Sequence, residues 1–331
     1  MTKEITDDDL YRHTSQYRTW SFTVEEFQAK KYQTWKRAAE TITAEIREKG
    51  LEDEVESLSL EEEDKLIRIY VSKVEAIAQL FHLPSQVRAT AISYFHKFYL
   101  IHSVMDYHPK NILNTCVFLA CKSENTFISI EKFCAAISKT EPKDILYLEF
   151  LVLQSLRFTL AVHNPLKSLH GFFLDMQTAL HGSLSASDLG GLMDSARRLI
   201  IKGFNTNASF FYTPPQIALS ALYLVNPDQT LLYINARYPD GGKIAFLLTA
   251  IEECSNELQN TAVPSEQEGR TIAKKLHRCS NLDKAAATKR KRSPSSTATP
   301  IEKRVKTDTP EDLDDTSTGG ASEGPPNAPI E

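Results

Sequence analysis

The sequence predicts an all-α protein built from two tandem five-helix units, with extra helices at both ends and a disordered C-terminal tail. Apolar residues recur at the three- and four-residue spacing of amphipathic helices through most of the chain. No glycine occurs between Gly50 and Gly171, which is unusual for strands and tight turns but ordinary for packed helices. A shift of 105 residues also aligns part of one half of the chain with the other.

Composition limits the classes of function. A chain of 331 residues with 41% hydrophobic content predicts two domains with real cores. The net charge of −5 argues against an electrostatic nucleic-acid binder. The five cysteines contain no C-x-x-C pair, so they predict reduced thiols, with neither a disulfide framework nor a metal site. The start of the chain is acidic and no apolar run has transmembrane length, so we expect a soluble intracellular protein without a membrane partner.

The N-terminal part predicts an irregular arm followed by one amphipathic helix. Residues 1–20 lack clear periodicity but include the large side chain of Trp20. Thr23 and Glu26 have the spacing of a capping box, which predicts a helix over about 22–48. Its single apolar stripe must pack against the rest of the protein.

Five helical patterns follow and form the first unit. A second capping box opens the first of them, and prolines mark the starts of two others. The fifth is apolar nearly all round, which is typical of a helix at the centre of a bundle. The five patterns lie at about 59–83, after Pro84, from Pro109, at about 130–138 and at about 145–156.

The second unit repeats the first. The shift of 105 residues places these pairs in register without a gap: Tyr107 with Tyr212, Pro109 with Pro214, Ile112 with Ile217, Cys116 with Ala221, Phe118 with Tyr223, and Leu119 with Leu224. Such a run indicates a duplicated helical unit. Further helices are expected at about 229–238 and 242–259, and a last amphipathic helix at 266–279. The expected domains are therefore 1–57, 58–162, 163–262, 263–284 and a tail at 285–331.

The tail is predicted to be disordered because Ala, Ser, Thr and Pro dominate it and apolar periodicity is absent. A basic run indicates a nuclear-import signal, and hence a nuclear protein, although a solvated charge run is the alternative; it comprises Lys289, Arg290, Lys291 and Arg292. Three hydroxyls that precede proline are candidate phosphorylation sites, although such dipeptides also occur by chance; they are Ser293, Thr299 and Thr309.

Two charges interrupt the apolar helices of the first unit. Lys122 ends the third helical pattern and Glu149 lies within the fifth. Taken singly, Lys122 is explained by the C-terminal dipole of its helix and Glu149 by solvation. Together, on helix surfaces that are otherwise apolar, the two charges indicate a protein-binding site.

Long strings in the chain resemble the cyclin family, and within it the cyclin H group of regulatory subunits of the CDK-activating kinase. The strings are HTSQYRTWSFTVEE, YFHKFYLIHSVMDYHPKNILNTCVFLACK, LAVHNPLKSLHGFFLDM and YTPPQIALSAL. The resemblance implies two tandem cyclin folds, of which the first binds the kinase. It places the kinase-binding Lys–Glu pair at Lys122 and Glu149, and it implies apolar contacts at Leu119, Leu153, Phe158 and Leu160.

The resemblance also implies a function. Such a cyclin activates a cyclin-dependent kinase by positioning the kinase's mobile helix. Its further expected partners are a RING-finger assembly factor and the core of transcription factor IIH. The complex would phosphorylate kinase activation loops and the RNA polymerase II tail. The chain itself is expected to be non-catalytic and to need no cofactor, because it contains neither a Gly-rich phosphate loop nor a kinase catalytic-loop motif.

An alternative is a general transcription factor with two cyclin folds that binds promoter DNA. That class would show an N-terminal zinc ribbon and basic helices, whereas the N-terminal third of this chain is acidic and lacks a C-x-x-C pair.

Overall fold

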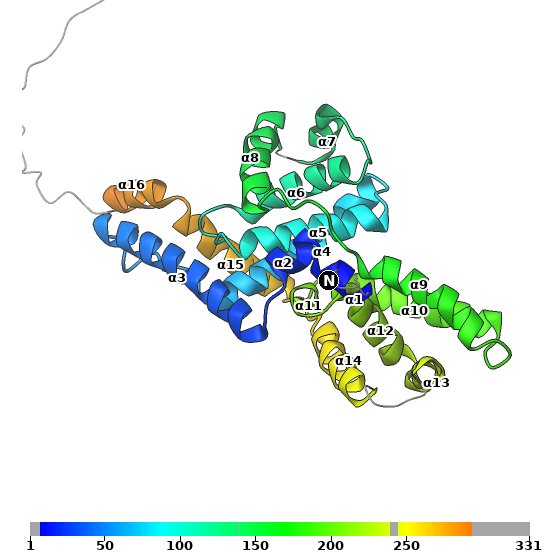
Figure 1. Cartoon of the computed structure of the whole chain (residues 1–331). Helices are drawn as coiled ribbons and strands as arrows, with labels where there is room; N and C mark the ends of the chain where they lie inside the picture. The colour runs from blue at the N-terminus through cyan, green and yellow to red at the C-terminus, as the bar shows by residue number, and fades with distance from the viewer. Residues whose placement is uncertain (1–6, 139, 239–243, 293–331) are drawn as a thin grey trace, which may run out of the picture. The chain divides into compact units, whose positions relative to one another are not determined.

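The computed structural model describes residues 7–138, 140–238 and 244–292, and every secondary-structure element in these ranges is helical (Figure 1). The prediction of an all-α protein is therefore confirmed. The helices form an N-terminal arm, two bundles and a C-terminal pair.

The N-terminal arm contains more regular structure than the sequence predicted. Two short helices, α1 (Asp7–Arg12) and α2 (Ser15–Trp20), occupy the stretch expected to be irregular. The long helix α3 (Val24–Glu48) begins at the predicted capping box. There the Thr23 amide donates to Glu26 Oε2 at 2.9 Å, and the Glu26 amide donates to Thr23 Oγ1 at 3.2 Å.

The first bundle is organised around α6. Its five helices are α4 (Leu60–Leu80), α5 (Ser85–Tyr99), α6 (Pro109–Ser123), α7 (Ile130–Ala136) and α8 (Pro142–Ser155). Helix α6 packs against α4, α5 and α8 and buries nearly its whole length. The expectation that the fifth helix would lie at the centre was wrong: α8 buries only Ile145, Val152 and Ser155.

The second bundle has the same plan around α12. Its helices are α9 (Pro165–Ala179), α10 (Ala186–Gly203), the short α11 (Ala208–Phe211), α12 (Pro214–Val225), α13 (Pro227–Arg237) and α14 (Ile244–Gln259). Helix α12 packs against α9, α10, α13 and α14. Pro109 and Pro214 are the first residues of α6 and α12, so the repeat inferred from the sequence relates the two central helices.

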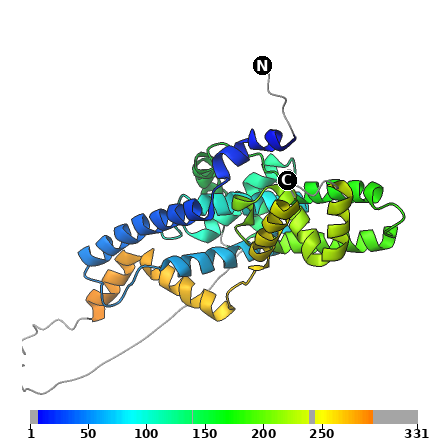
Figure 2. The same cartoon turned by 60° about the horizontal axis from the view of Figure 1, so that its bottom comes forward.

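The C-terminal pair completes the first bundle (Figure 2). Helix α15 (Glu266–Cys279) packs against α4, and its Ile272, Leu276 and Cys279 join the core of the first bundle. Helix α16 (Leu282–Arg292) runs past the boundary at 285 where the disordered tail was expected to begin. The rest of that tail, from residue 293 onward, lies outside the described residues.

A separate apolar cluster ties the arm to both bundles. It is formed by Trp20, Phe27, Leu100 and Phe210, which are all buried. The Phe22 amide also donates to the Phe210 carbonyl at 2.9 Å. The arm therefore contacts the end of α5 and the second bundle at once.

Candidate protein-binding interface

Lys122 and Glu149, which are 27 residues apart in sequence, meet on the surface of the first bundle. Lys122 lies in the last turn of α6, where the helix dipole favours a cation. Its Nζ lies 2.5 Å from Glu149 Oε1 on α8 and 5.1 Å from the centre of the Phe118 ring. The Lys122 side chain is 45% exposed and the Glu149 side chain 15%. The structure thus brings together the two charges singled out in the sequence.

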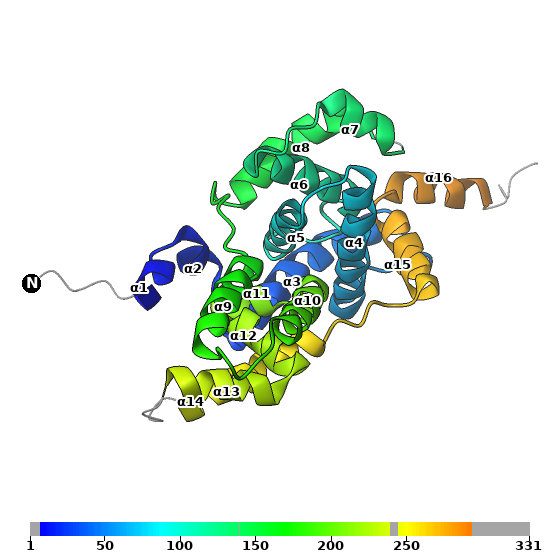
Figure 3. The ribbon, with the colours of Figure 1, turned by 90° about the vertical axis from the view of Figure 1, so that its right-hand side faces the viewer.

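The outer face of α8 is apolar and exposed. Leu146 is 50% exposed, Tyr147 81% and Phe150 59%, and all three lie within one turn of Glu149. Positions three and four apart share one side of a helix, so Leu146, Glu149, Phe150 and Leu153 form a continuous stripe. Figure 3 shows α8 on the outside of the bundle, with α6 between α8 and α5. This stripe, with the exposed Tyr147 beside it, surrounds a charged pair with aliphatic and aromatic side chains, which is the composition of a protein-binding surface.

The four predicted apolar contacts differ in exposure. Phe158 is 62% exposed and its ring lies against Phe150, with the ring centres 6.4 Å apart. Leu153 and Leu160 are partly buried and pack on the core of the first bundle. Leu119 is 4% exposed and belongs to the core itself, so in the free chain it supports the surface from beneath.

The turn that presents Phe158 has an uncommon backbone. Arg157 has φ of 52° and Phe158 has φ of 55°, the left-handed region, which costs a residue with a side chain about 1–2 kcal/mol. Strain of this kind persists only where surrounding contacts hold it. One such contact is the Tyr94 hydroxyl, which donates to the Leu160 carbonyl at 2.7 Å. Burial raises the pKa of Tyr94 to about 12, so this donor keeps its proton.

Sequence reasoning missed Leu146, Tyr147 and Phe150. The signal was present, because α8 is apolar nearly all round, but the same pattern describes a fully buried helix and was interpreted as one. A helix that packs on one side alone exposes its remaining apolar residues to a partner. The positions of the neighbouring helices decide whether a helix is buried all round or on one side, and the sequence of the helix does not give those positions.

The basic run lies in α16 rather than in an extended tail. Lys289 Nζ donates to the Gly50 carbonyl at 2.5 Å, beyond the end of α3. Arg290, Lys291 and Arg292 are the last helical residues. The candidate phosphorylation sites Ser293, Thr299 and Thr309 lie outside the described residues.

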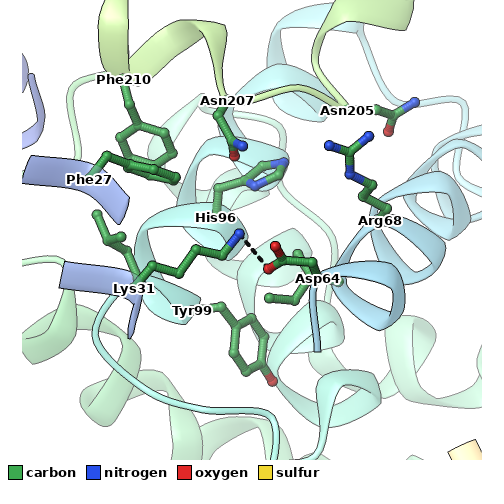
Figure 4. A pocket seen from close by; sticks show the side chains of 11 residues that line it. Phe27, Lys31, Asp64, Arg68, His96, Tyr99, Asn205, Asn207 and Phe210 are labelled. Atoms are coloured by element: carbon green, nitrogen blue, oxygen red, sulfur yellow. Dashed lines mark ion pairs between the residues drawn. The ribbon is translucent and has the colours of Figure 1, made fainter. Parts of the chain in front are cut away.

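A small pocket lined by both polar and apolar side chains lies between α3, α4, α5 and the second bundle (Figure 4). It has room for about 30 Å³, enough for one or two waters. Lys31 and Asp64 form an ion pair in it, and burial lowers the pKa of His96 to about 4. The pocket is too small for a nucleotide or a peptide, so it adds no second candidate site.

The described residues include neither a metal-binding cluster nor a membrane-spanning helix. No group of three His, Cys, Asp or Glu side chains in those ranges could hold a metal ion. No helix there has the length and apolar character needed to cross a bilayer.

Comparison with known proteins gives the family. A family model for the N-terminal domain of cyclins matches residues 42–161, and one for the cyclin C-terminal domain matches residues 164–259. Cyclin CCL1 of Saccharomyces cerevisiae is 37% identical over 354 residues, which cover 92% of this chain and 90% of the relative. This chain belongs to the cyclin family. The resemblance found in the sequence is confirmed.

Other relatives fall in the same group of cyclins. Cyclin-H of Xenopus laevis is 32% identical over 222 residues, covering 64% of this cyclin and 67% of the relative. A chain of the CAK complex of Chaetomium thermophilum, solved with ATP-gamma-S, has a TM-score of 0.77 and 26% identity, covering 90% of this cyclin and 99% of that chain. A chain of the yeast TFIIK (Kin28/Ccl1/Tfb3) complex has a TM-score of 0.64 and 39% identity, covering 75% of this cyclin and 100% of that chain.

Proposed function

We propose that this cyclin is a non-catalytic regulatory subunit that binds and activates a cyclin-dependent kinase through α6, α8 and the turn after α8. The observation that carries the proposal is the exposed apolar surface of α8, formed by Leu146, Tyr147 and Phe150, beside the Lys122–Glu149 pair. The structural similarity to chains of the CAK and TFIIK complexes supports the choice of a kinase as partner.

The chemistry of this surface suits a helix of the kinase. Exposed aromatic side chains supply contact area at low entropic cost, and they are enriched among residues that dominate binding energy. The Lys122 ammonium and the Glu149 carboxylate can each exchange part of their internal bond for charge-assisted hydrogen bonds to the partner, which fixes its orientation.

Activation would follow from differential affinity. Protein kinases need a Lys–Glu ion pair, with the Glu on a mobile helix, to orient the phosphates of ATP. A cyclin that binds the inward position of that helix more tightly than the outward position shifts the kinase toward its active state. The cyclin then needs no catalytic residue of its own.

The relatives also support the larger assembly. A three-component TFIIK complex containing Ccl1 supports a third subunit, which by family resemblance is a RING-finger assembly factor. By the same resemblance, the complex works in the nucleus with the core of transcription factor IIH and phosphorylates kinase activation loops and the RNA polymerase II tail.

Affinity capture from nuclear extract tests the kinase proposal. Wild-type cyclin should retain a cyclin-dependent kinase with activity on an RNA polymerase II tail peptide, and a folded Lys122→Ala/Glu149→Ala variant should lose it. The matched control is Asp175→Ala/Arg237→Ala, which removes an ion pair of the second bundle and should retain the kinase. Retention of promoter DNA without a kinase would favour the alternative transcription factor.

Nuclear import is tested separately. We assign the import signal to Lys289, Arg290, Lys291 and Arg292, with Ser293, Thr299 and Thr309 as sites that could modify it. Replacing Arg290, Lys291 and Arg292 by Ala leaves the Lys289 contact with Gly50 in place. That variant should activate the kinase normally in vitro and accumulate less in the nucleus. Unchanged nuclear accumulation would reject the assignment.

A further inference from the structure

The turn after α8 is held from the N-terminal arm. Trp20, the last residue of α2, is 2% exposed, and its Nε1 donates to Thr159 Oγ1 at 2.8 Å. The Thr159 hydroxyl in turn donates to the Leu156 carbonyl at 2.6 Å. The Thr159 hydroxyl thus accepts one hydrogen bond and donates another. It links the arm to the C-terminal end of α8, on the other side of the two residues with left-handed backbone, Arg157 and Phe158.

A second contact from the arm holds the far side of the same connector. Gln16 Oε1 accepts a hydrogen bond from the His163 amide at 2.7 Å, and Gln16 is buried. The Tyr11 ring lies edge-on to the His163 ring, with ring centres 5.6 Å apart. Figure 3 shows α2 beside the connector that runs from α8 to α9. Thr159 and His163 are therefore each hydrogen-bonded to a residue of the arm more than 130 positions earlier in the chain.

Trp20 also covers a buried lysine side chain. Its ring lies 5.6 Å from Lys97 Nζ on α5, and Lys97 Nζ is buried with no hydrogen-bond partner among the described residues. Removing the indole would open this site to water and disturb more than one contact. Thr159 is the better position for a test, because its hydroxyl serves only the link between Trp20 and Leu156.

We propose that the Trp20–Thr159 hydrogen bond is a latch that holds the strained turn in the conformation that presents Phe158 to the kinase. The proposal rests on the proposed function of the α8 surface. Trp20 and Thr159 are positioning residues in this proposal. Both lie behind the kinase-binding surface, and they affect the kinase through the position of Phe158.

The physical reason is that contacts on both sides of the turn oppose the relaxation of its strained backbone. Two successive left-handed residues would relax to ordinary backbone angles unless contacts on both sides prevented it. The Tyr94 hydroxyl holds Leu160 and the arm holds Thr159, so the exposed ring of Phe158 keeps one position in the free cyclin. A partner then binds a preformed surface and loses less affinity to ordering the loop.

The test compares Thr159→Val, which keeps the shape but loses the hydroxyl, with Thr159→Ser, which keeps the hydroxyl. Kinase affinity should fall about tenfold for Thr159→Val and stay within about twofold for Thr159→Ser. The control is Thr41→Val, which removes an exposed hydroxyl whose bond lies within α3. Amide hydrogen exchange of residues 156–164 in the free cyclin should rise only for Thr159→Val.

A double-mutant cycle with Phe158 decides whether the latch acts through that ring. In a Phe158→Ala background, Thr159→Val should cause no further loss of kinase affinity. Additive losses, or unchanged exchange at 156–164, would overturn the latch. If Phe158→Ala weakens binding and Thr159→Val does not, the latch fails and the proposed function stands. If Phe158→Ala binds the kinase as tightly as wild type, the latch is rejected, and the proposed function is then decided by the Lys122→Ala/Glu149→Ala variant alone.

Discussion

Lys122 Nζ lies 2.5 Å from Glu149 Oε1, so in the free cyclin the two charges neutralise each other before any partner arrives. Neither charge is fully buried, and Glu149 is the more enclosed of the two. A pair in this position adds only up to about 1 kcal/mol to folding stability. Its value therefore lies in keeping both groups in place on an otherwise apolar surface, at no large cost in desolvation.

Reversing the pair separates its internal role from its role toward a partner. Lys122→Glu/Glu149→Lys can still form an ion pair, so the free energy of unfolding should change by no more than about 1 kcal/mol. Kinase affinity should fall by about 3 kcal/mol, more than 100-fold, because each partner group now meets a like charge. Isothermal titration and chemical denaturation measure the two effects.

The second bundle supplies the control for this exchange. Asp175→Arg/Arg237→Asp reverses a comparable exposed pair and should leave kinase affinity unchanged. If the Lys122→Glu/Glu149→Lys variant bound the kinase as tightly as wild type, the pair would serve folding alone.

The exposed aromatic residues of α8, Tyr147 and Phe150, should affect binding of the kinase without affecting the stability of the cyclin. Phe150→Ala and Tyr147→Ala remove exposed side chains, so thermal stability should stay within about 0.5 kcal/mol of wild type. Each should weaken kinase binding, by about 2 kcal/mol for the larger effect, because aromatic anchors dominate such interfaces. Phe246→Ala in α14, where the side chain is 81% exposed, is the matched control. Equal effects of all three substitutions on binding would remove the case for α8.

The helices were largely predictable because their signals are local. Capping boxes at Thr23 and Ser59 and prolines at 109 and 214 fix helix starts through contacts within one turn, and the structure has helices at each. Lys122 and Glu149 stood out in the sequence for a different reason, because each is a charge on an otherwise apolar helix surface; their role toward a partner stays a prediction.

What failed depended on distant neighbours. Helix α8 was placed at the bundle centre because its pattern alone cannot say which neighbours cover it. The part of α16 from residue 285 onward was assigned to the disordered tail because its sequence lacks apolar periodicity, and only the packing of Leu282, Ala285 and Ala286 against the first bundle explains its order. The link between Trp20 and Thr159 spans 139 residues and has no local signal.

Lys97 should make stability depend on pH. Burial lowers its pKa from 10.5 to about 7. Between these values the unfolded chain holds the proton and the folded chain does not, so stability rises with pH across that window. Lys97→Met removes this dependence, and its stabilising effect should be greater at pH 6 than at pH 10 by up to about 5 kcal/mol.

Chemical denaturation of Lys97→Met and wild type at several pH values measures this difference. Lys36→Met, at an exposed lysine of α3, is the control and should show a difference from wild type that does not vary with pH. A Lys97→Met difference that is equally independent of pH would mean that Lys97 has the same pKa in the folded and the unfolded chain, as a solvated lysine does.

The C-terminal boundary gives the last prediction. Leu282 opens α16 and is 4% exposed in the core of the first bundle, so Leu282→Ala should cost about 2–4 kcal/mol of unfolding free energy. Leu80→Ala in α4, where the side chain is 54% exposed, should cost less than about 0.5 kcal/mol. Ending the chain after Arg292 should leave the melting temperature unchanged, because the composition beyond that point predicts disorder. Ending it after Ser280 should lower the melting temperature, since the truncation removes Leu282 along with the Lys49–Asp283 ion pair. Equal melting temperatures for the two truncations would show that α16 adds nothing to the first bundle.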